Sequence, residues 1–303
     1  MRYYNSIDNN YTSTKKSSDY SDERYSLLIR NVNTNLNFHM FLQDFCSSYS
    51  ICLSQNYQND DFYKFDGTID TFEDLFGYDF LRYDLDKLLS NIAENLILFG
   101  RAFLERIYWY DENNKLMKIS YECINCKKIK VRRKHLYYRV YREQRKKVKG
   151  KIKEENIVEF RLKDLGFRKR YIVKRIRKLR RFENPDIELV QSKFFDFDKY
   201  VKKNEYHTLK KMKNIYWNAR NNSNQFLSEP YLVYRIIRFD MLKNSFLEYM
   251  ISRINEDLKK IGDSCGFSGA IKYNSKVKNY DSIIQDLKTG QKTCEQISKI
   301  IFR

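Results

Sequence analysis

Apolar residues near the middle of the chain change from a helical period to a strand period. From Asp84 onward they recur every three or four positions, as on a helix with one buried face, at Leu85, Leu88, Leu89, Ile92, Leu96, Phe99 and Phe103. Gly100 interrupts this helical pattern, where it permits close packing. Residues 104–110 and 115–121 then favour strands, and Asp111-Glu112-Asn113-Asn114 between them tolerates left-handed turn geometry. The pattern predicts a helix that leads into a β-hairpin.

A second long helical pattern occupies the last third of the chain. Ser228-Glu229-Pro230 is a typical helix start, and apolar residues then continue at helical spacing to Ile261, with Gly262 as the expected stop. Such a helix of about 30 residues would be roughly 45 Å long. Residues 266–273 are expected to form a strand and 280–301 a further helix. A buried helix is also expected within 26–51, a loop over 54–70 and irregular structure over 182–227.

Between these regions the apolar residues alternate with basic ones. Residues 127–133, 136–142 and 156–162 are predicted to be strands, and 146–151 an exposed hairpin tip. Residues 168–181 predict a cationic helix with a narrow apolar stripe at Ile172, Ile176 and Leu179. Together the elements predict an α+β protein. We expect a flexible N-terminal arm over 1–24, a mixed helix and β-hairpin domain over 25–227, and a long helix with a small α/β segment over 228–303.

Composition narrows the class of protein. Hydrophobic residues make up 42% of the chain, which is enough for a sizeable core, and nine glycines with two prolines make a glycine-rich dinucleotide-binding fold or a propeller less probable. No apolar run approaches the roughly 18 residues of a membrane-spanning helix, so no membrane partner is expected. The first residues lack the apolar core of a signal peptide, and six scattered cysteines favour reduced thiols, so we expect synthesis in the cytosol.

The charge of the chain is concentrated in one basic segment, residues 127–181. It holds 25 of the 58 Lys and Arg residues but only 5 of the 39 Asp and Glu residues, so the rest of the chain is close to neutral. Charge at this density favours a polyanionic partner. Tyr137, Tyr138, Tyr141 and Tyr171 lie among the cations and could stack on unpaired bases. An acidic lipid surface and a merely solubilising face are the alternatives, and nothing indicates base-specific reading.

The residues expected to contact nucleic acid are cations of this basic segment. They are Arg132, Arg133, Lys134, Arg145, Lys146, Lys147, Lys149, Lys174, Arg175, Arg177 and Lys178.

Catalytic and metal signatures are weak. Cys123 and Cys126 have the spacing of half a zinc site, but no second close pair exists, so two thiols at a hairpin end are the favoured interpretation. Three histidines, with no catalytic triad, phosphate loop or HExxH sequence, leave no recognisable catalytic group. The acidic stretch 60–86 could hold magnesium, although a solvated loop face explains it as well. We therefore expect no enzyme, no cofactor and no metal.

Residues 94–121 (ENLILFGRAFLERIYWYDENNKLMKISY) resemble the portal proteins of tailed bacteriophages. In that family a helix ends in a glycine-containing turn and is followed by a hairpin with an acidic or Asn/Gly-rich tip. The resemblance extends to a Tyr-containing strand at 136–141, to Asn156-Ile157-Val158-Glu159-Phe160-Arg161, and to the long helix 230–261 followed by 266–273. The last two would correspond to the stem helix and the clip, and the domain before them to the wing.

The resemblance implies a structural virion protein. Portals form rings, usually dodecamers, at one capsid vertex, where they dock the terminase motor and pass double-stranded DNA during packaging and ejection. The protein would then be found in the virion, and in the host cytoplasm during assembly, with capsid proteins and the motor as partners. The alternative hypothesis is a sequence-independent nucleic-acid-binding protein of replication or mobilisation. A metal-dependent nuclease, based on the acidic stretch alone, is a third.

Overall fold

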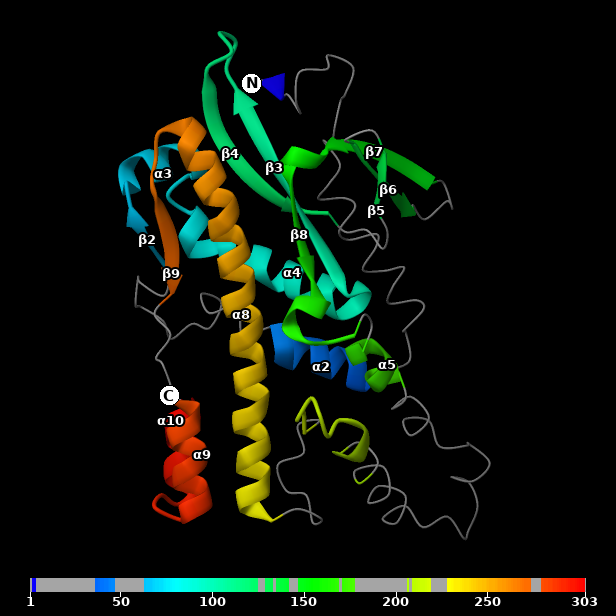
Figure 1. Cartoon of the computed structure of the whole chain (residues 1–303), viewed down its shortest axis with the longest axis vertical. Helices are drawn as coiled ribbons and strands as arrows, with labels where there is room; N and C mark the ends of the chain where they lie inside the picture. The colour runs from blue at the N-terminus through cyan, green and yellow to red at the C-terminus, as the bar shows by residue number, and fades with distance from the viewer. Residues whose placement is uncertain are drawn as a thin grey trace. The chain divides into compact units, whose positions relative to one another are not determined.

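The structure is a computed structural model that describes residues 2–3, 36–46, 63–124, 129–132, 135–141, 147–168, 171–177, 206, 209–218, 228–273 and 279–302. Helices and small antiparallel sheets occur together, so the predicted α+β class is confirmed (Figure 1). The chain divides into two compact units, each made of three segments. Unit 1 contains residues 1–33, 49–170 and 247–274, and unit 2 contains 34–48, 171–246 and 275–303. The predicted boundary between 227 and 228 stays a prediction.

Unit 1 is built around strand β3 (Arg101–Tyr110). Strand β4 (Leu116–Cys123) pairs with it on one side, and β8 (Ile157–Arg161) pairs with its first half on the other, where β1 (Arg2–Tyr3) meets its end. Figure 1 shows β4, β3 and β8 side by side. Helix α4 (Leu85–Phe99) packs against this sheet, and its apolar residues are almost fully buried. Successive residues of β3 from Ala102 to Ile107 are buried, so both faces of this part of the strand are covered.

The predicted β-hairpin is present between β3 and β4. Asp111 organises the turn, because its carboxylate oxygen accepts hydrogen bonds from the backbone N–H groups of Asn113 (2.8 Å) and Lys115 (2.7 Å). Asn114 adopts a left-handed conformation with φ 58°, as asparagine tolerates better than most residues. The local sequence therefore determines the turn.

Helix α4 is shorter than the apolar pattern predicts. It ends at Phe99 because Gly100 adopts a left-handed conformation, φ 71°, and its N–H bonds the carbonyl of Leu96 at 2.8 Å. The predicted continuation to Phe103 is wrong, and Phe103 is a buried residue of β3. Gly100 is thus a helix C-cap, a position where glycine avoids the steric cost of a Cβ.

Residues 63–67 form a strand and a helix begins at Ile69, so the predicted loop over 54–70 is wrong for these residues. Strand β2 (Tyr63–Gly67) pairs antiparallel with β9 (Gly269–Tyr273), helix α3 (Ile69–Phe76) follows, and the π-helical turn η3 (Phe80–Asp84) leads into α4. Their cores share a cluster of aromatic rings, among them Phe65 and Phe72 with ring centroids 4.0 Å apart. The alternation of Tyr63 and Phe65 is short, and acidic residues on both sides of it make the stretch resemble a loop.

Helix α8 (Glu229–Cys265) has 37 residues and contributes its first part to unit 2 and the rest to unit 1. The predicted stop at Gly262 is wrong, because the helix continues to Cys265 and ends before Gly266, which has φ 79°. Gly262 is instead needed for close approach, since a Cβ there would lie 2.3 Å from the backbone oxygen of Phe267. After α8 the chain turns back past Gly262 and enters β9.

Two buried charges join α8 to the sheet within unit 1. Arg106 of β3 and Asp257 of α8 approach to 3.4 Å, and both side chains are less than a tenth exposed. The hydroxyl of Tyr121 on β4 donates to Asp257 at 2.7 Å, and Arg106 donates to the carbonyl of Glu155 at 2.5 Å. Glu155 belongs to the short 3-10 turn η4 (Glu154–Asn156) before β8.

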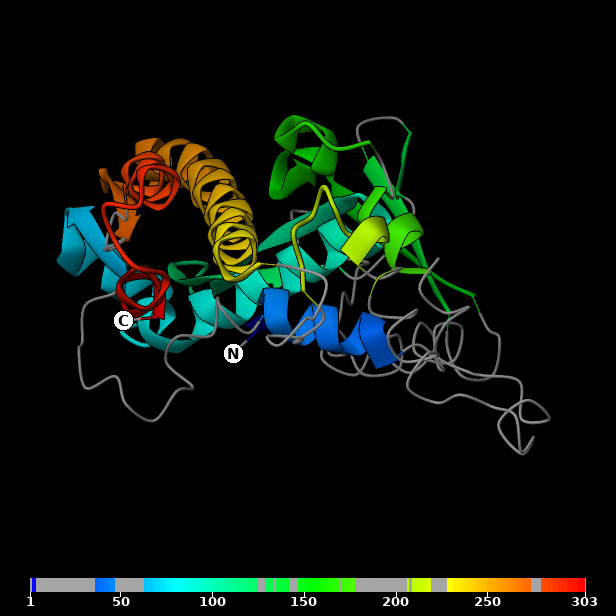
Figure 2. The ribbon, with the colours of Figure 1, turned by 90° about the horizontal axis from the view of Figure 1, so that it is seen from below.

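Unit 2 contains α2 (Leu36–Cys46), α5 (Tyr171–Arg177) and the first part of α8. Helices α2 and α5 lie side by side (Figures 1 and 2). Phe41 and Phe45 of α2 pack in an aromatic cluster with Trp217, Phe239 and Phe246, and the Trp217 indole donates to Asp44 at 2.9 Å. The helix predicted within 26–51 is confirmed over 36–46, and its remainder lies outside the described residues.

The predicted helix 280–301 is two helices, α9 (Tyr280–Thr289) and α10 (Cys294–Phe302). Gly290 ends α9 with φ 71°, and Thr293 starts α10 by accepting a hydrogen bond from the N–H of Gln296. Ile283, Ile284 and Ile297 pack with Val233 and Ile237 of α8, which keeps both helices against it (Figure 1). The apolar period continues across the break, which is why it resembles one helix.

Candidate nucleic-acid interface

The first part of the basic segment forms a three-stranded antiparallel sheet in unit 1. Strands β5 (Ile129–Arg132), β6 (His135–Tyr141) and β7 (Lys147–Lys153) follow one another in sheet order. The strands predicted over 127–133 and 136–142 are thus confirmed over their described residues. The hairpin tip predicted over 146–151 is wrong from 147 onward, because these residues belong to β7.

The register of this sheet separates charge from apolar residues. Successive positions of a strand alternate between the two faces, and directly paired positions share a face. The register pairs Tyr137 with Lys130 and Lys151, and Arg139 with Lys149. One face therefore collects the positions of Lys130, Arg132, His135, Tyr137, Arg139, Tyr141, Lys147, Lys149, Lys151 and Lys153. The other collects those of Ile129, Val131, Leu136, Tyr138, Val140, Val148, Gly150 and Ile152, none of them charged.

We call the first of these the cationic face. Like charges on directly paired or neighbouring positions repel one another, so this arrangement is destabilising without an anion. A polynucleotide would supply this counter-charge through its phosphates, and tyrosine is a residue type that can stack on unpaired bases. The face has the chemistry for sequence-independent contact with nucleic acid.

Three of the predicted contact residues, Arg132, Lys147 and Lys149, share the cationic face. Lys174, Arg175 and Arg177 are on α5 and belong to unit 2. Arg133, Lys134, Arg145, Lys146 and Lys178 lie outside the described residues. Tyr138, which the sequence groups with the other tyrosines, occupies a position on the opposite face.

Helix α5 buries an apolar side chain on one side and leaves cations accessible on another. Ile172 is fully buried, Lys174 is exposed, and the Arg175 guanidinium lies 5.2 Å from the ring centre of Tyr171. The Tyr171 hydroxyl accepts a hydrogen bond from Asn214 at 3.1 Å. The cationic helix predicted over 168–181 is confirmed over 171–177, while Arg168 precedes the helix.

The named candidates omit several members of the cationic face: Lys130, Arg139, Lys151 and Lys153, with Tyr137 and Tyr141. The signal that finds them is the two-residue period of Lys and Arg within each strand. That signal becomes usable only when the pairing of the three strands is known, because a shift by one residue would mix the two faces.

The described residues offer little support for a metal site. They contain no group of three or more His, Cys, Asp or Glu side chains that could hold a metal ion. Cys123 accepts a hydrogen bond from Asn95 at 3.3 Å, and Cys126 lies outside the described part of the chain. In the acidic stretch, Asp66 forms an ion pair with Lys272 on the neighbouring strand.

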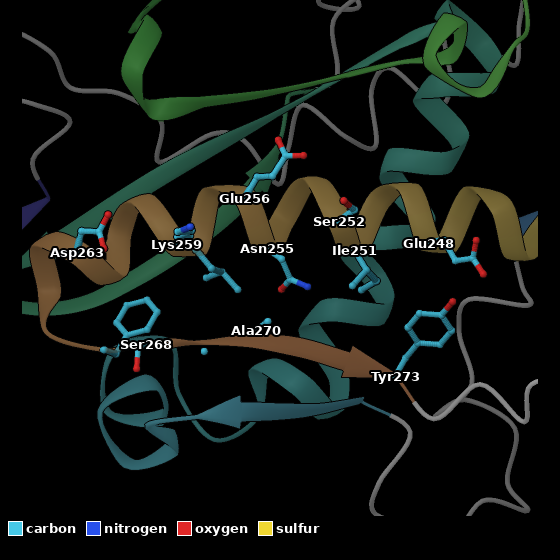
Figure 3. Close-up of a pocket in the computed structure, with 13 residues that line it drawn as sticks. Glu248, Ile251, Ser252, Asn255, Glu256, Lys259, Asp263, Ser268, Ala270 and Tyr273 are labelled. Carbon is cyan, nitrogen blue, oxygen red and sulfur yellow. The ribbon is translucent and has the colours of Figure 1, made fainter.

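A groove of about 680 Å³ lies in unit 1 between α8 and β9 (Figure 3). Its centre is occupied by Asn255, whose amide donates to the carbonyl of Ile271 at 2.9 Å and accepts from the N–H of that residue at 2.8 Å. Figure 3 shows this side chain reaching from the helix to the strand. Asn255 thus provides hydrogen-bond partners for backbone groups of β9 and joins this strand to α8. The groove therefore has a structural role.

Within the described parts of the chain, no helix is both long enough and apolar enough to cross a membrane. Comparison of the sequence with models of known protein families finds no match. Comparison with curated proteins also finds no match.

Proposed function

We propose that the protein is a portal-like structural protein of a virion, which forms a ring at a capsid vertex and conducts double-stranded DNA during packaging and ejection. The observation that carries the proposal is helix α8, with 37 residues followed at once by the short strand β9. In the family that the sequence resembles, a long stem helix leads into the clip in this way.

The order of the preceding elements supports the proposal. Helix α4 ends in a glycine turn, the β3–β4 hairpin has an Asp/Asn tip, and β8 contains the Ile-Val-Glu-Phe-Arg sequence. Each occurs in the order that the resemblance implies. In this proposal the chain has no catalytic role, because the terminase motor supplies the energy of packaging and the portal supplies a passage.

The cationic face would bind DNA phosphates without regard to sequence. Its position on a small sheet separate from β3, β4 and β8 would leave the hairpin and α8 to make contacts between subunits and with capsid proteins. The protein would assemble in the host cytoplasm and remain in the virion.

The mass of the purified protein tests this proposal. A ring predicts a mass near twelve times the 37.0 kDa of one chain by light scattering, and annular particles in negative stain. Nuclease treatment before the measurement removes particles held together only by DNA. A stable monomer at high protein concentration would contradict the proposal.

The cationic face favours a second candidate function, a sequence-independent nucleic-acid-binding protein of replication or mobilisation. This candidate requires no ring, and the same measurement separates the two. A monomer that binds DNA with strong salt dependence would support it and exclude the portal.

A further inference from the structure

Four residues of α8 in unit 2 share one face of the helix. Tyr231, Tyr234, Arg235 and Arg238 are spaced by three, four and seven positions, so their side chains lie on one stripe. Within the described residues, neither arginine forms an ion pair with a carboxylate. An uncompensated cation is unusual at a buried position, because it keeps its desolvation cost without a counter-charge.

Arg235 is the more buried of the two, with 1% of its surface exposed. Its Nε donates to the side-chain oxygen of Asn218 at 2.6 Å, and its Nη2 donates to the carbonyl of Trp217 at 3.0 Å. Burial lowers the pKa of this guanidinium. Neutral acceptors and two tyrosine rings, whose centres lie 6.0 Å from the guanidinium carbon, therefore hold a positive charge in the interior.

Arg238 has donors to spare. Its guanidinium lies 5.2 Å from the ring centre of Tyr216, and its hydrogen bond goes to the sulfur of Met241 at 3.9 Å, a weak acceptor. The buried Nε of Arg238 has no hydrogen-bond partner. A planar cation with unused donors is suited to a phosphate, which accepts two parallel hydrogen bonds from one guanidinium.

Tyr216, whose ring lies beside both arginines, has an unfavourable backbone conformation. Its φ is 63°, in the left-handed region that a bulky residue rarely adopts. Its ring faces both guanidinium groups. Such conformations persist where the surroundings enforce them, often at ligand sites.

We propose that this arginine–tyrosine cluster binds single-stranded nucleic acid. Arg238 contacts a backbone phosphate, and the charge of Arg235, which lies beside the same Tyr216 ring, raises the local positive potential. Tyr231, which is 36% exposed and stacked on Tyr234 with the two rings inclined by 22°, provides a surface for an unpaired base. A duplex keeps its base faces covered, so it uses only the phosphate contact. The residues of the site lie outside the basic segment in the sequence, and the site does not depend on ring formation.

Fluorescence anisotropy of the full chain with a labelled oligothymidine tests the site. We expect Arg238→Gln to weaken binding roughly tenfold and to reduce the slope of log affinity against log salt by about 0.7, the value for one phosphate contact to a single strand. The matched control is Arg82→Gln in unit 1, which removes the same charge from a guanidinium 4.2 Å above the ring of Tyr78. It should change affinity by less than about threefold, because Arg82 belongs to unit 1 and is not part of the cluster.

Stacking has its own test. Tyr231→Ala should lower single-strand affinity about tenfold, Tyr231→Phe should retain it, and duplex affinity should change little in both. Photo-crosslinking of a strand that carries 5-iodouracil should attach to the peptide containing Tyr231. Thermal unfolding of each variant shows whether it is folded.

Three results would overturn the inference. The first is an equal loss of single-strand affinity in Arg238→Gln and Arg82→Gln. The second is crosslinking confined to residues 127–181. The third is competition by inorganic phosphate together with no effect of Tyr231→Ala on affinity. The last would indicate a phosphate site without a base. A monomeric mass would exclude the portal and leave this site intact.

Discussion

At the scale of single residues, the pair of buried charges formed by Arg106 and Asp257 determines how α8 meets the sheet of unit 1. A buried ion pair contributes little net stability compared with apolar residues of the same size, but loss of one partner leaves the other charge stranded. Arg106 and Asp257 are 151 positions apart, and neither stands out from the many charged residues of the sequence. The pair is a product of tertiary structure.

Asp257→Leu should lower the free energy of unfolding by about 3–5 kcal/mol, because Arg106 keeps its desolvation cost without its partner. Urea denaturation at neutral pH measures the change. The double variant Arg106→Met/Asp257→Leu should recover most of the loss, and Asp263→Asn at an exposed position of α8 should have little effect. A double variant no more stable than Asp257→Leu would contradict the explanation.

Tyr249 predicts a pH dependence in the alkaline range. Its hydroxyl donates to Asp164 at 2.9 Å and accepts from the N–H of Arg161 at 2.8 Å, and burial is the main cause that raises its pKa to about 12. The folded state keeps the hydroxyl protonated at a pH where the unfolded chain ionises. Its contribution to stability is therefore complete below pH ~10 and is lost as the pH rises from ~10 to 12.

Tyr249→Phe should be less stable than the wild type near pH 8, and the difference should shrink between pH 10 and 12. Denaturant titrations at several pH values measure it. Tyr83→Phe, at a side chain that is 60% exposed, is the control and should show no such convergence. A difference that stays constant with pH would exclude this role for Tyr249.

At the scale of elements, local sequence predicts the interiors of helices and strands better than their ends. The core residues of α4, the turn at Asp111 and the long period of α8 are recognisable because each depends on neighbours within a few positions. The end of α4 at Gly100 and the continuation of α8 through Gly262 have opposite outcomes for the same residue type. Gly100 adopts a left-handed conformation and ends its helix, whereas Gly262 stays helical and lies against the backbone of Phe267.

Gly262→Ala tests the close approach of Phe267 to α8. Alanine is normally the better helix former by up to about 1 kcal/mol, but its Cβ would meet the backbone of Phe267. We expect a net loss of about 1–3 kcal/mol in the free energy of unfolding, typical of overpacking. Ser252→Ala on an exposed turn of α8 is the control and should be neutral or slightly stabilising. A stabilising Gly262→Ala would show that the close approach is absent.

At the scale of the whole molecule, seven of the 25 cations of the basic segment occupy positions on one face of a three-stranded sheet. The triple variant Arg132→Glu/Lys147→Glu/Lys149→Glu reverses three cations that share the cationic face. We expect weaker duplex binding and a salt slope smaller by about 3, since each phosphate contact contributes about 0.9. Filter binding over a range of salt concentrations measures both quantities.

The control for this variant is Lys87→Glu/Lys115→Glu/Lys118→Glu, which makes the same change of charge at exposed lysines of unit 1. It should lower affinity less and leave the slope nearly unchanged, because these positions lie outside the basic segment. Equal effects of the two triple variants would mean that DNA responds only to net charge.

The sequence by itself determined the α+β class, the concentration of cations in residues 127–181, the β3–β4 hairpin and the long helix, because each depends on composition or on periods of a few residues. The tertiary structure decided the partner of Asp257, the roles of Gly100 and Gly262, and the assembly of Tyr216 with Arg235 and Arg238. It also decided which cations share a face, since strand register is a property of paired strands. Contacts between distant residues have no local period, and so no pattern along the chain records them.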